Sequence, residues 1–209
     1  MDDQAFDLPF VLLVEGVSDR GVFETLLARA GNSSVRVIEY GGKTRLAARL
    51  EAIALNEAFQ ERCRWLGIVR DADGNEARTV QSIRTALTNA GLPSPAAGEL
   101  IAPGPLAVQI IVLPGDGGSG ELEDVIWRAI AAESPEVAKC VDGFLACARP
   151  DGLPTADLAK ARVYSVVAAL SRPDRPLGAS ARATDGPFPM HSPILAGLLD
   201  FIPLDDKAL

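Results

Sequence analysis

Four short apolar runs occupy the first part of the chain, and glycine or acidic residues follow each run within two positions. They cover residues 10–14, 35–40, 65–73 and 108–113. Runs of this length that are rich in Val, Ile and Leu are typical of strands buried on both faces of a sheet. Apolar residues recur at helical spacing between these runs. The alternation predicts an α/β fold, with a central parallel sheet of about four strands flanked by helices.

The pattern changes after Glu121, where helical periodicity dominates and no comparable strand follows. Residues 171–191 are rich in Pro, Gly and Arg, which predicts a long loop. A final helix is expected over residues 194–201, since Ser-Pro precedes it. We therefore divide the chain into an α/β domain, residues 1–131, and a helical C-terminal extension, residues 132–209, packed on the same domain.

Acidic residues follow two of the expected strands. Glu15 comes directly after the first strand, and Asp71 and Asp73 end the third. Parallel strands place their carboxyl ends at one edge of the sheet, where ligands bind, so these three side chains should converge. Carboxylates held close together repel one another unless a cation lies between them. Oxygen ligands without His or Cys suit Mg²⁺ or Mn²⁺, so we predict a metal site formed by Glu15, Asp71 and Asp73.

The order of these motifs resembles the Toprim pattern. A buried strand precedes Glu-Gly-x-x-Asp, at Glu15 to Asp19, and a later strand ends in Asp-x-Asp, at Asp71 and Asp73. The resemblance covers roughly residues 10–130. It extends to the Toprim domains of OLD-family nucleases, ribosomal-RNA maturases, topoisomerases and bacterial primases, and to a compact stand-alone family of uncharacterised proteins.

This resemblance implies a Toprim-like, Rossmann-like sheet and adds further residues to the site. Asp19 matches the second acid of the first motif and is expected in an outer shell of metal ligands. The OLD-family likeness implies a second metal, for which Glu121 and Glu123 are the candidates. Asp19, Glu121 and Glu123 also fit the acids that offset a helix dipole, and turn formation could account for Asp71 or Asp73.

Lys160 is the candidate cation of the site. A lysine close to a scissile phosphate would stabilise charge in the transition state, although an ordinary exposed helix lysine explains it as well. Arg172, Arg175 and Arg182 belong to the expected loop, where they could guide a phosphate-bearing substrate. His191 has no acid at a spacing that would suggest a hydrolytic triad, and we assign it a structural role.

Charge and composition narrow the function classes. The net charge of −8 disfavours a broad DNA-binding surface, because phosphate neutralisation needs clustered Lys and Arg. No apolar run is long enough to span a membrane, and Met-Asp-Asp-Gln does not resemble a signal peptide, so a cytoplasmic location is expected. Cys63, Cys140 and Cys147 lack metal-binding spacing and are expected to be buried thiols.

The favoured hypothesis is a Mg²⁺- or Mn²⁺-dependent phosphodiester-processing enzyme, a nuclease acting by metal-assisted hydrolysis on nucleic acid. Its catalytic residues would be Glu15, Asp71, Asp73 and Lys160. One alternative is a phosphohydrolase that acts on a nucleotide, which the acidic charge favours. The other is a non-catalytic Toprim-like module that binds a protein partner through its helical half.

Overall fold

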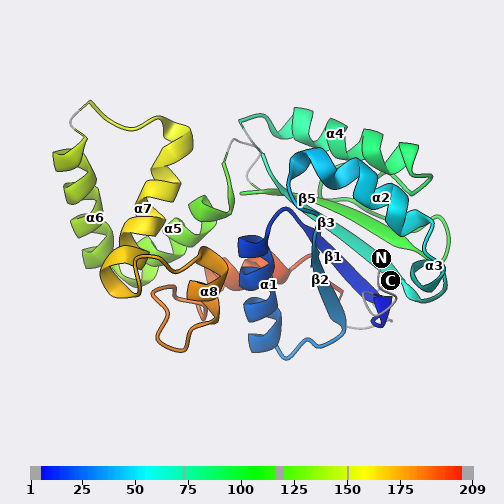
Figure 1. Ribbon diagram of the computed structural model, residues 1–209, viewed down its shortest axis with the longest axis horizontal. Coiled ribbons are helices and arrows are strands. Elements are labelled where there is room, and N and C mark those ends of the chain that lie inside the picture. The colour runs from blue at the N-terminus through cyan, green and yellow to red at the C-terminus, as the bar shows by residue number, and fades with distance from the viewer. Residues whose placement is uncertain (1–5, 73, 116–119, 150, 204–209) are drawn as a thin grey trace.

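A five-stranded sheet with the order β2-β1-β3-β5-β4 forms the centre of the computed structural model, which describes residues 6–72, 74–115, 120–149 and 151–203 (Figure 1). The strands are β1 (Phe10–Val14), β2 (Val35–Glu39), β3 (Trp65–Asp71), β4 (Leu100–Ile101) and β5 (Ala107–Leu113). β1 pairs in parallel with β2 and with β3, and β3 pairs in parallel with β5. β4 runs antiparallel to β5. The sheet is therefore mostly parallel.

The predicted count of about four strands omitted β4. This strand lies in the Pro- and Gly-rich connection between residues 92 and 105, where Leu100 pairs with Gln109 and Ile101 with Val108. A strand of two residues is too short to show an alternation of apolar and polar positions. It covers the outer edge of β5, as short edge strands commonly do.

Helices cover both faces of the sheet and also extend beyond it (Figure 1). The α-helices are α1 (Val17–Arg29), α2 (Leu46–Ala54), α3 (Glu57–Arg62), α4 (Glu76–Asn89), α5 (Leu122–Glu133), α6 (Pro135–Ala148), α7 (Thr155–Leu170), α8 (Leu177–Arg182) and α9 (Pro193–Ala196). Two 3₁₀ turns, η2 (Lys43–Arg45) and η3 (Gly197–Leu199), precede α2 and follow α9. α2 and α4 lie on one face and α1 on the other, while α6 and α7 lie at one end of the molecule.

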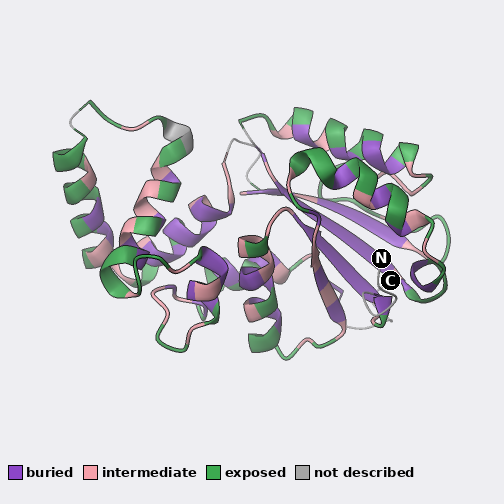
Figure 2. Cartoon of the chain, viewed as in Figure 1, coloured by how far each residue is buried: buried purple, intermediate pink, exposed green. Residues whose placement is uncertain are grey.

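Two hydrophobic clusters lie on the two faces of the sheet, between the strands and the helices that cover them, because successive strand residues point to opposite faces. Val11 and Leu13 of β1 pack in the cluster beneath α2, α3 and α4. Phe10, Leu12 and Val14 belong to the other cluster, which continues through α1 and α5 to Val163, Val166 and Val167 of α7. Figure 2 shows the buried strands and the buried inner sides of these helices. The helices after Glu121 thus share a core with the sheet.

The expected loop over residues 171–191 contains a helix, α8, which packs closely on α1. A six-residue helix has little stability of its own, so burial of Leu177 and Ala181 against α1 must stabilise it. The last expected helix is shorter than predicted, because α9 ends at Ala196 and continues only as η3. The Ser-Pro pair does begin this helix, since Pro193 is its first residue and the Ser192 hydroxyl accepts a hydrogen bond from the Ile194 N–H at 3.3 Å.

The cysteines differ from the expectation of buried thiols. Cys63 is buried, but Cys140 and Cys147 are exposed on the solvent side of α6, and all three are free. α6 buries only the side that carries Ala138 and Val141. Within the described ranges, no helix combines the length and the apolar character that crossing a bilayer would require.

The close contact between α1 and α8 provides a test of the fold. A methyl group on Gly178 would lie 2.7 Å from the Ser18 carbonyl oxygen and 3.1 Å from Gly21 Cα. We expect Gly178→Ala to lower the free energy of unfolding by about 1–3 kcal/mol, because backbone atoms at this contact cannot give way. Urea denaturation measures the change.

The matched control is Gly143→Ala in α6, where the added methyl group would meet open space. This variant should be stabilised by about 0.5–1 kcal/mol through helix propensity alone. A Gly178→Ala protein that unfolds at or above the wild-type urea midpoint would contradict the packing of α8 on α1.

Candidate active site

An open cavity of about 440 Å³ lies where β1 and β3 end, between the first turns of α1 and α5 and the side of α7. Five carboxylates and one ammonium group are among the side chains that line it: Glu15, Asp19, Glu39, Asp71, Glu123 and Lys160. Gly16, Val17, Ser18, Gly41, Gly42, Leu122 and Leu177 complete the lining. The carboxyl ends of parallel strands thus deliver acids to one cavity, as the order of the strands predicts.

Asp19 caps α1 while it lines the cavity. Gly16 is the N-cap residue, and its N–H donates a hydrogen bond to the Asp19 carboxylate at 3.1 Å. A serine two residues later, Ser18, is a residue type that commonly caps a helix, but it lies inside the first turn. The acid three residues after Gly16 satisfies the helix start instead. Burial raises the pKa of Asp19, although the hydrogen bond from Gly16 acts in the opposite direction.

Asp71 joins the end of β3 to the start of α5. Its Oδ1 accepts a hydrogen bond from the Leu122 N–H at 3.0 Å. Burial raises the pKa of Asp71 to about 8, and the negative charges of Asp19, Glu123 and Glu15 add to the effect. The Leu122 N–H lowers the pKa but does not offset these causes. Asp71 is therefore mostly protonated at neutral pH unless a cation is present.

Glu123, in the first turn of α5, is a buried residue of the cavity. Burial raises its pKa to about 7, and the neighbouring charge of Glu121 contributes in the same direction. Asp71 and Glu123 thus resist ionisation for the same reason, since each is withdrawn from water beside other acids.

Glu121 connects the acids to α7. It is the N-cap residue of α5, and its N–H donates to the Asp124 carboxylate at 2.9 Å. Its Oε2 forms an ion pair with Lys160 Nζ, while its Oε1 is buried without a hydrogen-bond partner among the described residues. Partial burial lowers the pKa of Lys160, but Glu121 and Glu123 outweigh it and raise the pKa overall. Lys160 therefore remains charged beside the cavity.

The turn after β2 fixes the backbone at Glu15. The Gly41 and Gly42 N–H groups donate to the Glu15 carbonyl at 3.1 and 3.0 Å. Both glycines have positive φ angles, 83° and 99°, which explains why two glycines occur here. They form a tight strand-to-helix turn, and their N–H groups are occupied by protein.

Glu39 is a residue of the cavity that was not predicted from the sequence. It is the last residue of β2, it lines the cavity, and Arg20 Nη1 lies 2.5 Å from its Oε2. Its position at the carboxyl end of a parallel strand is the signal that identified Asp71, so the same reasoning could have found it. The ion pair with Arg20 neutralises Glu39 and distinguishes it from Asp71 and Glu123.

The structure brings most of the predicted site residues together. Glu15, Asp19, Asp71, Glu123 and Lys160 line the cavity, and Glu121 contacts Lys160 at its border. Asp73 lies outside the described residues. Across the described part of the chain, no three or more His, Cys, Asp or Glu side chains form a group arranged to hold a metal ion.

Two of the three arginines of residues 171–191 form ion pairs away from the cavity. Arg175 lies 3.6 Å from Asp185, and Arg182 lies 3.5 Å from Glu24 of α1. This segment reaches the cavity through the apolar side chain of Leu177.

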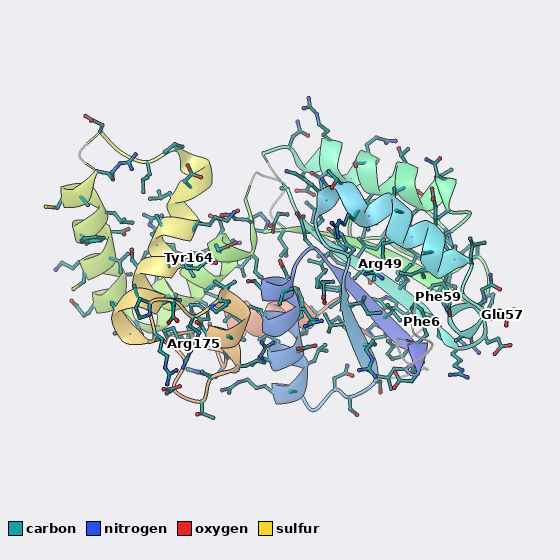
Figure 3. The ribbon with its side chains drawn as sticks, viewed as in Figure 1. Phe6, Arg49, Glu57, Phe59, Tyr164 and Arg175 are labelled. Atoms are coloured by element: carbon teal, nitrogen blue, oxygen red, sulfur yellow. The ribbon has the colours of Figure 1, made fainter. Side chains whose placement is uncertain are left out.

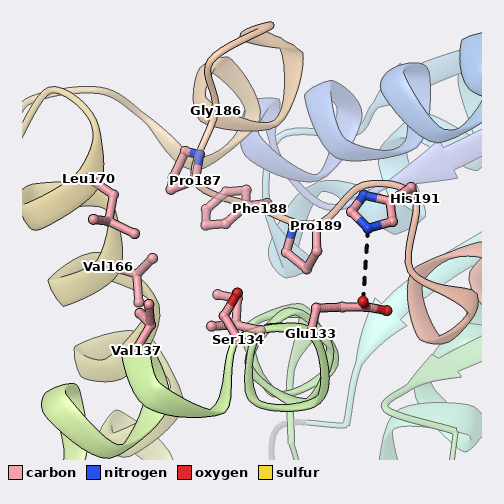
Figure 4. A pocket seen from close by; sticks show the side chains of 11 residues that line it. Glu133, Ser134, Val137, Val166, Leu170, Gly186, Pro187, Phe188, Pro189 and His191 are labelled. Atoms are coloured by element: carbon pink, nitrogen blue, oxygen red, sulfur yellow. Dashed lines mark ion pairs between the residues drawn. The ribbon is translucent and has the colours of Figure 1, made fainter.

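A second cavity, of about 270 Å³, lies between α5, α6, α7 and residues 186–191 (Figure 4). Its apolar lining side chains are Ile130, Val137, Val166, Leu170, Pro187, Phe188 and Pro189. His191 lies at its rim, 3.8 Å from Glu133, and its side chain is 72% exposed. This cavity does not gather carboxylates, so the candidate active site is the acidic cavity at the sheet edge.

Comparison with known proteins gives one match. A family model described as a protein of unknown function (DUF3226) matches residues 9–202. No curated protein and no solved structure matches the chain. The matched range runs from β1 through η3, so the sheet and the helices after it belong to one family unit.

The raised pKa of Asp71 predicts a pH-dependent effect on stability. Between the usual aspartate pKa and about 8, folded protein holds a proton that unfolded protein releases, so stability falls as pH rises through this range. In the presence of chelator, Asp71→Asn should remove this loss while it keeps an acceptor for the Leu122 N–H. We expect a gain of about 1–3 kcal/mol at pH 8 and little gain near pH 4, as urea denaturation would measure.

Asp151→Asn is the control, because Asp151 is an exposed aspartate in the turn between α6 and α7. It should follow the wild-type pH dependence. If Asp71→Asn is no more stable than wild type at pH 8, ionisation of the buried Asp71 does not lower the free energy of unfolding.

Proposed function

The chain belongs to the DUF3226 family, and we propose that it is a Mg²⁺-dependent nuclease that hydrolyses phosphodiester bonds. The observation that carries this proposal is the pair of carboxylates, Asp71 and Glu123, whose pKa values are raised to about 8 and about 7. Burying acids beside one another is costly until a cation compensates their charge. Perturbed acids that line a cavity with a lysine are typical of a catalytic site.

The donor set of the cavity suits a hard divalent cation. All candidate ligands are carboxylate oxygens, and the buried Oε1 of Glu121 lacks a hydrogen-bond partner in the described ranges. Mg²⁺ commonly binds through one or two carboxylates and retains several waters. Asp71 and Glu123 would hold the ion directly, and Glu121 would contact one of its waters. Asp19 and Glu15 would act through those waters.

The side chains of this protein then have distinct roles. A bound Mg²⁺ or Mn²⁺ would supply an activated nucleophile and would stabilise negative charge on the phosphate. Glu15, at the end of β1, is placed to accept a proton within the cavity. Lys160, which remains protonated, would stabilise the charge that develops on the transferring phosphoryl group.

The positions of two acids at this edge of the sheet support the proposed relation to Toprim domains. β1 and β3 are neighbouring parallel strands, and Glu15 and Asp71 lie at their carboxyl ends. This is the arrangement that the Glu-Gly-x-x-Asp and Asp-x-Asp motifs imply.

A nucleotide phosphohydrolase is the second candidate. The net charge of −8 disfavours long duplex DNA, and a cavity of about 440 Å³ lies in the size range of small-ligand sites. The same residues would act on a phosphoester in either case. A non-catalytic module would instead use the helices α5 to α7 to bind a partner protein.

The metal assignment predicts the behaviour of a double variant, Asp71→Asn with Glu123→Gln. Calorimetry with Mn²⁺ should show that affinity falls at least about 100-fold, because two direct ligands lose their charge. Metal-dependent hydrolysis of oligonucleotides should be lost in parallel. Glu136→Gln, at an exposed position in the first turn of α6, is the matched control. Unchanged Mn²⁺ affinity in the double variant would rule out this site.

Lys160→Ala separates catalysis from metal binding. The variant should bind Mn²⁺ about as well as wild type, because Lys160 is not a ligand. Its kcat should fall by about 10²–10³-fold, as for the loss of one donor to a developing charge. Lys160→Arg should recover part of the rate. Full activity in Lys160→Ala would show that the lysine only neutralises Glu121.

A further inference from the structure

Tyr164 lies on α7 within electrostatic range of Glu123 and Lys160, two residues that line the acidic cavity. It lies four residues after Lys160, and this spacing places two side chains on the same face of a helix, one turn apart. Lys160 lines the cavity, and Tyr164 lies one turn further along α7 (Figure 3). With 40% of its surface exposed, it is one of the few large apolar side chains left open to solvent.

The ring of Tyr164 has no partner within the described ranges, either as a stacking contact or as a hydrogen bond through its hydroxyl. Several other large aromatic side chains are engaged. Trp65 stacks on Phe201 at 6.3 Å between ring centroids, and Arg162 lies over Trp127 at 5.0 Å. Tyr40 is fully buried. Tyr164 thus offers an aromatic surface beside a cavity lined mainly by polar groups.

The phenol of Tyr164 is neutral at physiological pH. Partial burial raises its pKa, and the nearby charge of Glu123 raises it further, although Lys160 acts in the opposite direction. A neutral ring beside a lysine does not repel a phosphodiester chain. It can stack on any nucleobase, since every base has a π-face.

Cations also follow the turn after β2. Gly41 and Gly42 of this turn line the cavity, and the exposed residues Lys43 and Arg45 come next in η2. The Arg45 side chain lies over Gly41, close to the position where a Cβ would be. Arg45 thus lies beside the turn that lines the cavity, and Lys160 lines the cavity from α7. An extended substrate that reaches from α7 to this turn would meet both cations.

We propose that the substrate is single-stranded nucleic acid, and that a base next to the scissile phosphate stacks on Tyr164 while Arg45 contacts a flanking phosphate. This inference rests on the proposed nuclease function and selects oligonucleotides over free nucleotides. It also gives α7 a role in the site, since the helix supplies both the cation and the stacking surface.

The test is the binding of a fluorescent oligothymidylate in Ca²⁺, measured by anisotropy beside an abasic oligomer of the same length. Tyr164→Ala should weaken oligothymidylate binding about tenfold and leave abasic binding unchanged, because only the base stacks. Tyr164→Phe should bind like wild type, since it keeps the ring. Arg45→Ala should weaken binding of both probes and reduce the salt dependence by about one phosphate contact.

Phe144→Ala is the matched control, because Phe144 is also an exposed aromatic residue, at 60%, but lies on α6. It should bind both probes like wild type. The inference is overturned if wild type does not prefer oligothymidylate to the abasic oligomer. It is equally overturned if Tyr164→Ala binds like wild type or weakens binding to both probes equally.

A separate assay distinguishes this failure from failure of the proposed function. Wild type with Mn²⁺ is tested on bis(p-nitrophenyl) phosphate, a small phosphodiester without bases. One outcome is that this compound is hydrolysed, that Asp71→Asn abolishes the reaction, and that Tyr164→Ala does not affect oligonucleotide binding. In that case the inference about single-stranded nucleic acid is wrong, and the proposed metal site is retained. If neither the small diester nor the oligonucleotide is hydrolysed, the proposed function itself fails.

Discussion

The burial of several carboxylates at one edge of the sheet is the constraint on which the site depends. Asp71 and Glu123 are withdrawn from water beside Asp19, so each resists losing its proton. A chain that needed only to fold would place apolar side chains at such positions, because buried charge is costly without compensation. The fold retains these acids and anchors Asp71 through the Leu122 N–H. Such a cluster is stable as a protonated pair or as a cation site, and we propose the second as its functional state.

The rest of the architecture holds these acids in place. The buried β1 and β3 deliver Glu15 and Asp71, and the core beneath them continues through α5 to α7. This continuity matters because α5 supplies Glu123 and α7 supplies Lys160, far apart in the sequence. The contact of α8 with α1, made close by Gly21 and Gly178, places Leu177 at the cavity. The helical extension therefore forms part of the site.

The sequence predicted those elements whose formation depends on the residues within them. The parallel strands, and the acids that follow β1 and β3, could be read from sequence because buried strands have a distinctive composition. β4 could not be predicted, since two residues carry no periodicity, and α8 could not, since its stability comes from packing on α1. Glu39 was overlooked although it follows the same rule as Asp71. Tyr164 was not predicted as a substrate-binding residue, because only the packing of α7 shows that it is exposed one turn from Lys160.

The most direct test of the proposed metal site is the number of protons released when Mn²⁺ binds at pH 7. Calorimetric titrations in buffers of different ionisation enthalpy measure it. With pKa values of about 8 and about 7, Asp71 and Glu123 together hold more than one proton in the metal-free protein at this pH. Because a ligand must be deprotonated to bind a metal, the account predicts release of about one to two protons per Mn²⁺ ion, and fewer at pH 9. Binding without proton release, or no binding, would contradict the assignment of these buried carboxylates as a metal site.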